Sequence, residues 1–370
     1  MIVLIRCNDI ISDSRTRKYV DFLERKKISF KIIAWDRMGN SPKLPNAIYC
    51  PAISKYNQGG IAAIIDRLKW MWFILKILLS FHDSLRIHAC DLDAAFPAIV
   101  YKMLSRRKNY VLFDVFDWIS DTLYNQGKIV SAAFAFMEWL SIKKADHIII
   151  CESERIKQIP YNIETRYSVL QNIPSFSTTD FLYEDKSFHF DNHLLTLVYI
   201  GGFTNDRCLS EVIDGAAQGC YNLNIAGYGT KDIVSKLELL KDCPHIRYYG
   251  KVEYTEGLRI MFNSDIIYAM YSKQNPNHLF AAPNKYYEAM FVGKPIITTN
   301  GIIIADKVKE NEFGYSINET LRDLQLLISS ISEEDIRNKA KKSSNLWEKY
   351  KSTTEQYLNT TYSEIMQITV

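Results

Sequence analysis

The sequence lacks the cysteine spacing of a disulfide framework or a zinc site. It has seven cysteines, an odd number, and no two of them are spaced as Cys-x-x-Cys. Several lie inside apolar, strand-like runs, where thiols are usually buried and reduced. The first residues, Met1–Arg6, lack the basic leader and cleavage site of a signal peptide, and their apolar run predicts a β-strand. We therefore expect a cytoplasmic protein with reduced cysteines.

The chain has little excess of either charge. Its 45 basic and 42 acidic residues leave a formal net charge of +3, whereas a dedicated nucleic-acid-binding protein usually carries a dense basic face. We therefore expect no nucleic-acid partner. With 370 residues, of which 47% are hydrophobic and 24% charged, the chain is long enough for two ordinary globular domains.

No Gly-x-Gly-x-x-Gly fingerprint follows the first strand-like run, which ends in Arg6-Cys7-Asn8-Asp9. In dinucleotide-binding domains those glycines let the backbone approach the pyrophosphate. Their absence disfavours a dinucleotide oxidoreductase.

The sequence also lacks an uninterrupted apolar run of the length, ~20 residues, that crosses a bilayer. Residues 61–81 come nearest, but this segment contains one aspartate and three basic residues. Three interpretations stay open: a buried crossover helix, a helix on the membrane surface with Trp70, Trp72 and Leu78 inserted, and a transmembrane helix as the least favoured.

Short β-rich runs alternate with helical patterns in both halves of the chain, which predicts parallel sheets with right-handed crossovers. The expected fold class is α/β with two doubly wound, Rossmann-like domains, at residues 1–180 and 181–345. The charged helical stretch 346–370 is expected to pack back on the first domain. The expected strands are Ile2–Cys7, Ser29–Trp35, Leu85–Cys90, Tyr110–Val115, His147–Cys151 and Tyr167–Asn172, then Leu194–Ile200, Asn222–Ala226, Ile246–Tyr249, Asp265–Met270 and Pro295–Thr299.

The segment Ala282–Thr298, APNKYYEAMFVGKPIIT, has the composition of a phosphate and ribose site. A loop with Pro283 opens a helix, and the positive end of the helix dipole beside Asn284 and Lys285 suits a phosphate. Glu288, further along, could accept hydrogen bonds from both hydroxyls of a ribose. An isolated match of this kind would more often be a plain helix with a C-terminal glycine.

Two glycine turns and one arginine follow strands of the second half. Gly201-Gly202 end a strand, where a ligand can approach the backbone closely, and Arg207 follows at the start of the next helix. Gly227-Tyr228-Gly229 follows the next strand. By itself Arg207 could be a solvated arginine, and a lone Gly-x-Gly is a weak signal.

In the first half, the run Arg86–Ala94 places His88 near the carboxyl end of a strand, with Asp91 ready to cap the following helix. A histidine there would face the crevice in which open α/β sheets bind ligands. A lone histidine is more often structural than catalytic.

The segment Ala282–Thr298 closely resembles the PNK-x-x-E-A-M-x-x-GKP-(I/V)-(I/V) segment of family-4 retaining glycosyltransferases. That family has the GT-B fold, in which two Rossmann-like domains with parallel sheets face a central cleft. Glu288 matches the second glutamate of the family's Glu–seven residues–Glu motif, whereas Phe280 stands at the first. Cys208 stands where the family often has the glycine of a Lys-Gly pair.

The resemblance implies a transferase that moves a sugar from a nucleotide-sugar, with UDP-sugars favoured and GDP-sugars second. It implies that Arg207 and Lys285 stabilise the diphosphate catalytically and that His88 lies beside the donor sugar. The remaining donor-site residues are Gly201, Gly202, Gly227, Tyr228, Asn284 and Glu288. The residues implied on the acceptor side are Asp13, Arg15, Asp91 and Asp117.

We expect no obligatory metal or other cofactor, because Asp91-Leu92-Asp93 opens a helix and does not lie in the loop context of metal-dependent transferases. The acceptor is expected to be a glycan or a lipid-linked oligosaccharide of bacterial surface polysaccharide assembly, at the inner face of the cytoplasmic membrane. The alternatives are a non-catalytic nucleotide-binding scaffold and a sugar-nucleotide epimerase of the same fold.

Overall fold

The computed structural model describes residues 1–8, 10, 13–37, 43–53, 60–122, 127–159, 166–174 and 181–368. The chain divides into two compact units. Unit 1 comprises residues 1–171 and 353–370, and unit 2 comprises residues 172–352.

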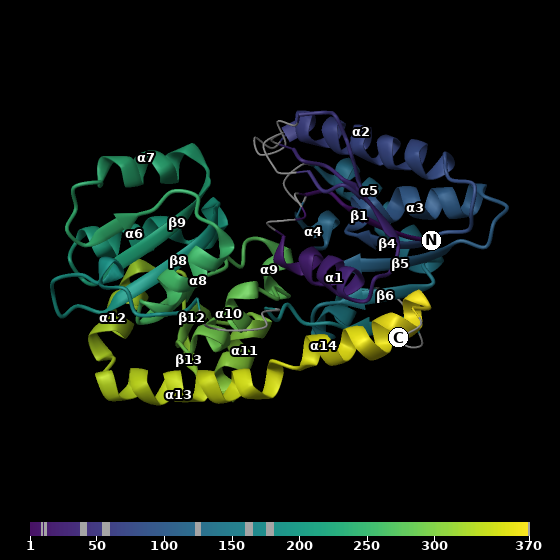
Figure 1. The fold of residues 1–370 in the computed structure, drawn as a ribbon. Coiled ribbons are helices and arrows are strands. Elements are labelled where there is room, and N and C mark those ends of the chain that lie inside the picture. Colours follow the sequence, from purple (N-terminus) through teal and green to yellow (C-terminus); the bar gives the residue numbers. More distant parts are fainter. Residues whose placement is uncertain are drawn as a thin grey trace. The chain divides into compact units, whose positions relative to one another are not determined.

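Within the described residues, unit 1 contains a parallel sheet of seven strands in the order β3-β2-β1-β4-β5-β6-β7 (Figure 1). The strands are β1 (Ile2–Arg6), β2 (Phe30–Ala34), β3 (Ala47–Tyr49), β4 (Arg86–Cys90), β5 (Tyr110–Val115), β6 (His147–Ile150) and β7 (Tyr167–Val169). Their apolar runs are buried because helices cover both faces, as parallel sheets require.

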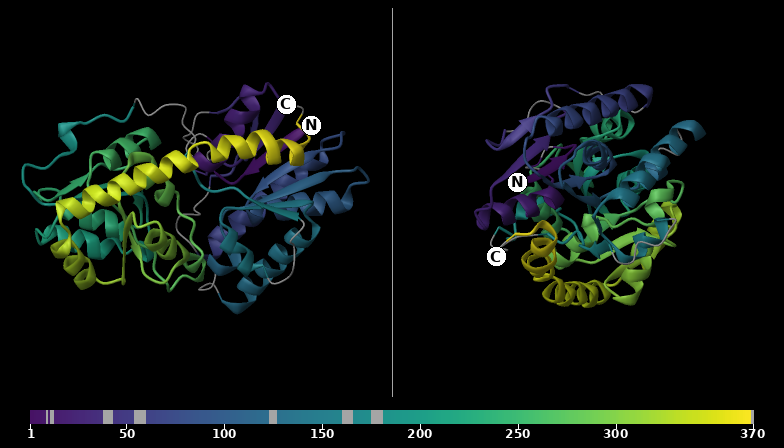
Figure 2. Two further views of the ribbon diagram at one scale, coloured as in Figure 1. Left: turned by 90° about the horizontal axis from the view of Figure 1, so that it is seen from below. Right: turned by 90° about the vertical axis from the view of Figure 1, so that its right-hand side faces the viewer.

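The helices α2 (Gly60–Leu79), α3 (Leu92–Leu104) and α5 (Lys128–Lys144) are the crossovers on one face of this sheet, and α4 (Ile119–Thr122) precedes α5. The other face is covered by α1 (Ser14–Arg25) and by the C-terminal helical segment of α14 (Thr353–Tyr357), a π-helical turn (Leu358–Tyr362) and α15 (Ser363–Met366) (Figures 1 and 2). The exposed ion pair between Arg25 and Glu355 links α1 to α14.

The crossover helix α2 has one buried and one exposed face. Trp70, Ile74 and Leu78 are fully buried against the sheet, and the Trp70 ring stacks on that of Trp35 at 5.8 Å between centroids. Trp72 is 67% exposed. Of the three interpretations of residues 61–81, insertion of Trp70 and Leu78 into a membrane is therefore ruled out, because both side chains belong to the core. Among the described helices, none is long and apolar enough to cross a membrane.

Unit 2 contains, among the described residues, a parallel sheet of six strands in the order β10-β9-β8-β11-β12-β13. The strands are β8 (Thr196–Phe203), β9 (Asn222–Gly229), β10 (Ile246–Tyr248), β11 (Ile266–Ala269), β12 (Ile296–Thr299) and β13 (Gly314–Ile317). The helices are α6 (Leu209–Ala217), α7 (Lys231–Leu239), α8 (Tyr254–Phe262), α9 (Pro276–Leu279), α10 (Asn284–Val292), α11 (Ile303–Glu310), α12 (Leu321–Ser330) and α13 (Glu333–Tyr350). The expected α/β class with two parallel, doubly wound sheets is confirmed.

The seven cysteines all lie in the described part of the chain and form no disulfide there. Five of them are buried and two are partly buried.

Candidate functional site

The carboxyl ends of β8 and β9 carry glycines at positions where a side chain would meet the neighbouring strand. Gly201 pairs with Gly227 in the parallel register, and both have φ +150°. A Cβ on Gly227 would lie 1.8 Å from the carbonyl oxygen of Gly201, so no other residue fits at this position. A Cβ on Gly201 would lie 3.1 Å from Nζ of Lys285, whereas one on Gly202 would have no neighbour within 4 Å. The carboxyl end of β8 is therefore a close-packed edge that Lys285 borders.

Helix α10 begins and ends as its sequence predicts. Pro283 is the N-cap, and the helix ends at Gly293, whose φ of +67° is left-handed. Asn284 and Lys285 are the first two residues of the helix, where the backbone N–H groups of the first turn point outward and the helix dipole is positive. The ammonium of Lys285 adds a full charge beside that dipole end.

The pKa of Lys285 is lowered, first by burial and also by the nearby positive charge of Arg207, while Glu288 opposes the change. The Nζ atom of Lys285 lies 5.2 Å from the centre of the Tyr199 ring. A cation held in such surroundings gains much from an anion, because a phosphate would offset both the burial and the repulsion between the two basic side chains.

Glu288 lies one turn further along α10 and is buried. The hydroxyl of Tyr254, the first residue of α8, donates a hydrogen bond of 3.0 Å to Oε1 of Glu288. Burial raises the pKa of Glu288, whereas Lys285 and Tyr254 oppose this rise. The carboxylate keeps acceptor capacity for the paired hydroxyls of a ribose.

Arg207 ends a short 3-10 turn, Asn205–Arg207, directly before α6. Its guanidinium lies 4.4 Å from the centre of the Tyr271 ring, a cation–π distance. The next residue, Cys208, has φ +52°, a left-handed conformation that glycine adopts most readily. Cys208 thus adopts the backbone conformation for which a glycine would be suited, and its carbonyl accepts a hydrogen bond of 2.8 Å from Tyr268.

A polar network beside Arg207 was not predicted from the sequence. Oδ2 of Asp206 accepts a hydrogen bond of 3.0 Å from Asn275 and lies 3.4 Å from Nε2 of His278. The other ring nitrogen of His278, Nδ1, lies 3.0 Å from the carbonyl oxygen of Ser272. Asn275 and His278 belong to the segment before the Pro283 motif, and no sequence pattern links them to Asp206. Their proximity depends on the tertiary fold.

Tyr228 and Phe280 complete the predicted region of unit 2. Tyr228 is exposed, and Nζ of Lys251 lies 5.4 Å from the centre of its ring. Phe280 follows α9 and provides an aromatic ring where the resembling family has its first glutamate. Within the described residues, Arg207, Lys285, Glu288 and the glycine edge therefore form one group in unit 2.

The four residues predicted for the acceptor side gather around Phe116 in unit 1. Nε of Arg6, at the end of β1, lies 2.5 Å from Oδ2 of Asp13, and the same guanidinium also pairs with Asp91. The guanidinium groups of Arg6 and Arg15 lie 4.2 and 3.9 Å from the centre of the Phe116 ring. The backbone N–H of Asp117 donates to Oδ1 of Asp91 at 3.2 Å. Unit 1 thus holds its own charged cluster at the carboxyl ends of β1, β4 and β5.

Asp91 does not cap α3 with its side chain, contrary to prediction. Its carboxylate instead accepts hydrogen bonds from the backbone N–H groups of Phe116 and Asp117, while its own backbone has φ +70°. A non-glycine residue in this region is strained, and such strain concentrates at functional sites. Burial raises the pKa of Asp91 to about 6, although Arg6 opposes the change.

His88 is fully buried, so the expectation that it faces a crevice is not met. It is the third of the five residues of β4, and its Nδ1 lies 3.0 Å from the Tyr362 hydroxyl of the C-terminal segment. Its Nε2 lies 3.4 Å from Oδ2 of Asp114, and Tyr19 packs edge-on against its ring. The C-terminal segment covers this face of the sheet, which is why His88 is enclosed.

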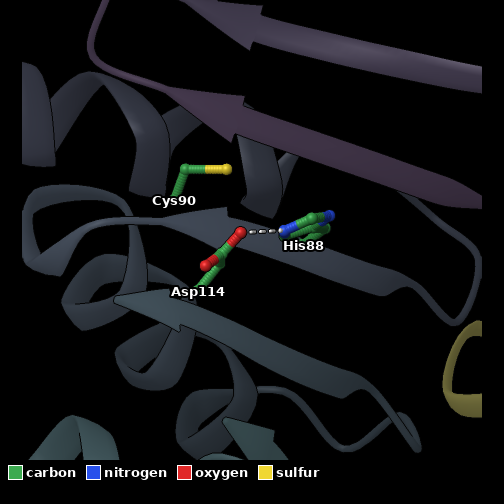
Figure 3. Close-up of side chains that lie close together, drawn as sticks. All are labelled: His88, Cys90 and Asp114. Atoms are coloured by element: carbon green, nitrogen blue, oxygen red, sulfur yellow. Dashed lines mark hydrogen bonds and ion pairs between the residues drawn. The ribbon is translucent and has the colours of Figure 1, made fainter. Parts of the chain in front are cut away.

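His88, Cys90 and Asp114 lie close enough together to raise the question of a metal site (Figure 3). Oδ1 of Asp114 already pairs with Arg15 at 2.5 Å, and Oδ2 accepts a hydrogen bond of 2.7 Å from Tyr19. Burial raises the pKa of the Cys90 thiol, and Asp114 raises it further, so the thiol stays protonated. These groups satisfy one another as a polar network within the core.

The two units and their sheets define a GT-B fold. No protein-family model matches the sequence, and no curated protein does. Solved structures do match over nearly the whole chain. Sucrose-phosphate synthase from Thermosynechococcus elongatus has a TM-score of 0.68 at 13% identity and covers 98% of this chain and 99% of its own. HepE from Anabaena, in complex with UDP-glucose, has a TM-score of 0.69 at 13% identity with the same coverage.

A third similar structure has a different activity. The UDP-GlcNAc 2-epimerase from Neisseria meningitidis, bound to UDP-GlcNAc, has a TM-score of 0.65 at 12% identity and covers 98% of this chain and 100% of its own. At these identities the likeness establishes the fold, so the activity has to be argued from the side chains.

Proposed function

We propose that this chain is a retaining glycosyltransferase of the family-4 type, which moves a hexosyl or related sugar from a nucleotide-sugar to a glycan or lipid-linked acceptor. The proposal rests chiefly on one observation, the grouping of Arg207, Lys285 and Glu288 beside the Gly201–Gly227 edge in unit 2. Two cations suit a diphosphate, a buried carboxylate suits a ribose, and a glycine edge allows close approach of the ligand. In this proposal residues 181–345 bind the donor and residues 1–180 bind the acceptor.

In the proposed reaction the bond between C1 of the sugar and the diphosphate breaks, and a bond from the acceptor oxygen to C1 forms. The acceptor proton passes to the leaving phosphate oxygen, so no side-chain base is required. Arg207, Lys285 and the N-terminus of α10 stabilise the charge that develops on the diphosphate. Gly202, Tyr228 and Asn284 line the donor site, and Tyr228 offers an exposed ring beside the position expected for the base.

The cluster of Asp13, Arg15, Asp91 and Asp117 is the proposed acceptor side. Its carboxylates and guanidinium groups can accept from and donate to sugar hydroxyls. Because His88 is enclosed, we assign it a supporting role: it contacts Asp114, which in turn pairs with Arg15.

A UDP-sugar is the favoured donor, with GDP-sugars second. HepE was solved with UDP-glucose and the epimerase with UDP-GlcNAc, and both share the fold of this chain. We propose a cytoplasmic enzyme of bacterial surface polysaccharide assembly that contacts the inner face of the membrane through residues 61–81. No metal is assigned, and activity is expected to persist in EDTA.

The first test is thermal stabilisation of the purified chain by UDP, GDP, CDP, dTDP and NAD. We expect one nucleoside diphosphate to raise the melting temperature, and Arg207→Ala and Glu288→Ala to abolish that increase. If no nucleotide stabilises the chain, or NAD alone does, the assignment fails.

A second candidate is a sugar-nucleotide epimerase, which the similarity to the UDP-GlcNAc 2-epimerase favours. Incubation with a UDP-sugar in the absence of an acceptor separates the two activities. An epimerase converts the sugar while it remains attached to UDP, whereas a transferase leaves the donor unchanged or slowly hydrolyses it. A non-catalytic scaffold would bind the nucleotide and turn over nothing with any acceptor.

A further inference from the structure

Helix α5 presents an apolar stripe to solvent that the sequence did not reveal. Ile129 is 87% exposed and Phe136 is 58% exposed, and Trp139 lies on the same side of the helix. The spacing of these residues along the helix places them on one face. The rings of Phe136 and Trp139 stack at 5.7 Å, and Nζ of Lys143 lies 4.8 Å from the Trp139 ring centre.

Helices α5 and α2 both pack on the same face of the unit 1 sheet (Figure 1). Met71 of α2 and Phe134 of α5 belong to one buried cluster above α3. The inner residues of the two helices therefore pack in one cluster together with Leu92 of α3. We use the name α2–α5 face for the outer apolar residues of the two helices, which are Leu68 and Trp72 on α2 and Ile129, Phe136 and Trp139 on α5.

Helices α2 and α5 carry more exposed basic than acidic side chains. Glu138 is the only carboxylate of α5, and it is buried and accepts hydrogen bonds from the backbone of Ile119 and Ser120. Asp66 is the only carboxylate of α2, and it lies 3.5 Å from Lys69. The exposed basic residues of these helices, and of the two positions that follow Ser105 at the end of α3, are Lys69, Lys76, Lys128, Lys143, Lys144, Arg106 and Arg107.

The end of α3 lies beside the end of α5, where Lys102 also pairs with Asp146 at 2.7 Å. Nζ of Lys102, near the end of α3, donates a hydrogen bond of 3.1 Å to the carbonyl oxygen of Lys144 at the end of α5. Met103 and Leu104 follow it and are exposed. Apolar side chains bordered by lysine and arginine fit the interface of an anionic bilayer, where aromatic rings enter the headgroup region and basic groups meet lipid phosphates.

We infer that the α2–α5 face docks on the surface of an anionic bilayer and that α5 is a membrane-contacting element in its own right. The inference deepens the proposed contact through residues 61–81 and rests on it. The apolar side chains and the lysines act together, because neither type of contact alone holds a protein firmly on a membrane.

The test is flotation of the full-length chain with vesicles of phosphatidylcholine, with and without phosphatidylglycerol, at low and high salt. We expect binding to the anionic vesicles that weakens at high salt. Ile129→Ser with Phe136→Ser, and separately Lys143→Glu with Lys144→Glu, should each weaken binding by about tenfold or more.

Matched controls lie in unit 2. Leu239 of α7 is 86% exposed, so Leu239→Ser removes a comparable exposed apolar side chain, and Lys231→Glu with Lys241→Glu reverses two exposed lysines. These controls should bind vesicles like the wild type. Unchanged melting temperatures of the α5 variants would show that their folds are intact.

Three outcomes would overturn the inference. The wild type could fail to bind anionic vesicles, the α5 variants could bind as well as the wild type, or they could abolish self-association of the chain instead of vesicle binding. The proposed donor site is tested separately, because stabilisation by UDP should be the same in the α5 variants and the wild type. Loss of vesicle binding with intact UDP binding concerns the α2–α5 face, whereas absence of UDP binding in the wild type contradicts the transferase.

Discussion

Tyr254 donates a hydrogen bond of 3.0 Å to Glu288, so a side chain of α8 fixes the carboxylate of α10. The contact joins two helices separated in sequence and orients a buried acid whose pKa is raised by burial. If Glu288 binds the ribose, Tyr254 determines which of its oxygens remains available.

Tyr254→Phe should weaken UDP binding by about tenfold, because a hydrogen bond to a charged group is lost. It should also raise the pKa of Glu288 further. The ionised acid accepts hydrogen bonds, so binding should weaken as the pH falls toward that pKa, and in the variant this should begin at a higher pH. Isothermal titration over a pH series measures both effects.

Tyr221→Phe is the matched control, because the buried Tyr221 hydroxyl donates a hydrogen bond of 2.9 Å to the carbonyl oxygen of Val212. It should lower stability without changing the affinity for UDP. Equal affinities of Tyr254→Phe and the wild type would show that Glu288 does not act on the nucleotide.

The glycine edge gives a second prediction. Gly227→Ala places a Cβ 1.8 Å from the carbonyl oxygen of Gly201, so β8 and β9 must separate at their carboxyl ends. Gly202→Ala meets nothing within 4 Å and is the control. We expect Gly227→Ala to lower the melting temperature clearly and to abolish stabilisation by UDP, whereas Gly202→Ala keeps the fold. Similar melting temperatures for the two variants would contradict the close approach.

Local signals allowed much of unit 2 to be predicted from the sequence. The apolar runs correspond to strands, and Pro283 and Gly293 mark the ends of α10 because N-cap and C-cap preferences depend on neighbouring residues only. The sidedness of α2 could not be predicted, since apolar residues occur around most of its circumference. Only packing shows that Trp70 is buried and Trp72 exposed.

Contacts between distant residues account for the other differences. His88 looked accessible because the segment that covers it, including Tyr362, lies at the far end of the chain. The group of Asp206 and His278 was missed for the same reason. Phe280 stands where the resembling family has its first glutamate. Nothing in the sequence indicated that the contact between Asp206 and His278 lies beside Arg207.

Glu138 provides a pH-dependent prediction for unit 1. Burial raises its pKa to about 7, well above its ordinary value. The folded state therefore favours the protonated acid, so this contribution to stability is present at low pH and is lost as the pH rises through 7. The free energy of unfolding of Glu138→Gln, relative to that of the wild type, should therefore be higher at pH 8 than at pH 5. The expected change is of the order of 2 kcal/mol. A constant difference across this range would contradict the raised pKa.

The contact between Asp206 and His278 predicts how Arg207 is held in place. Nδ1 of His278 lies 3.0 Å from the carbonyl oxygen of Ser272, and Nε2 lies 3.4 Å from Oδ2 of Asp206, so the ring ties the turn before α6 to the segment before α10. His278→Ala should release this turn and weaken UDP binding by about fivefold, with little further loss when combined with Arg207→Ala. Calorimetry of the two single variants and the double variant measures this coupling.

His245→Ala, on the histidine that contacts Asn222, is the control and should leave UDP affinity unchanged. Additive losses would show that His278 acts independently of Arg207.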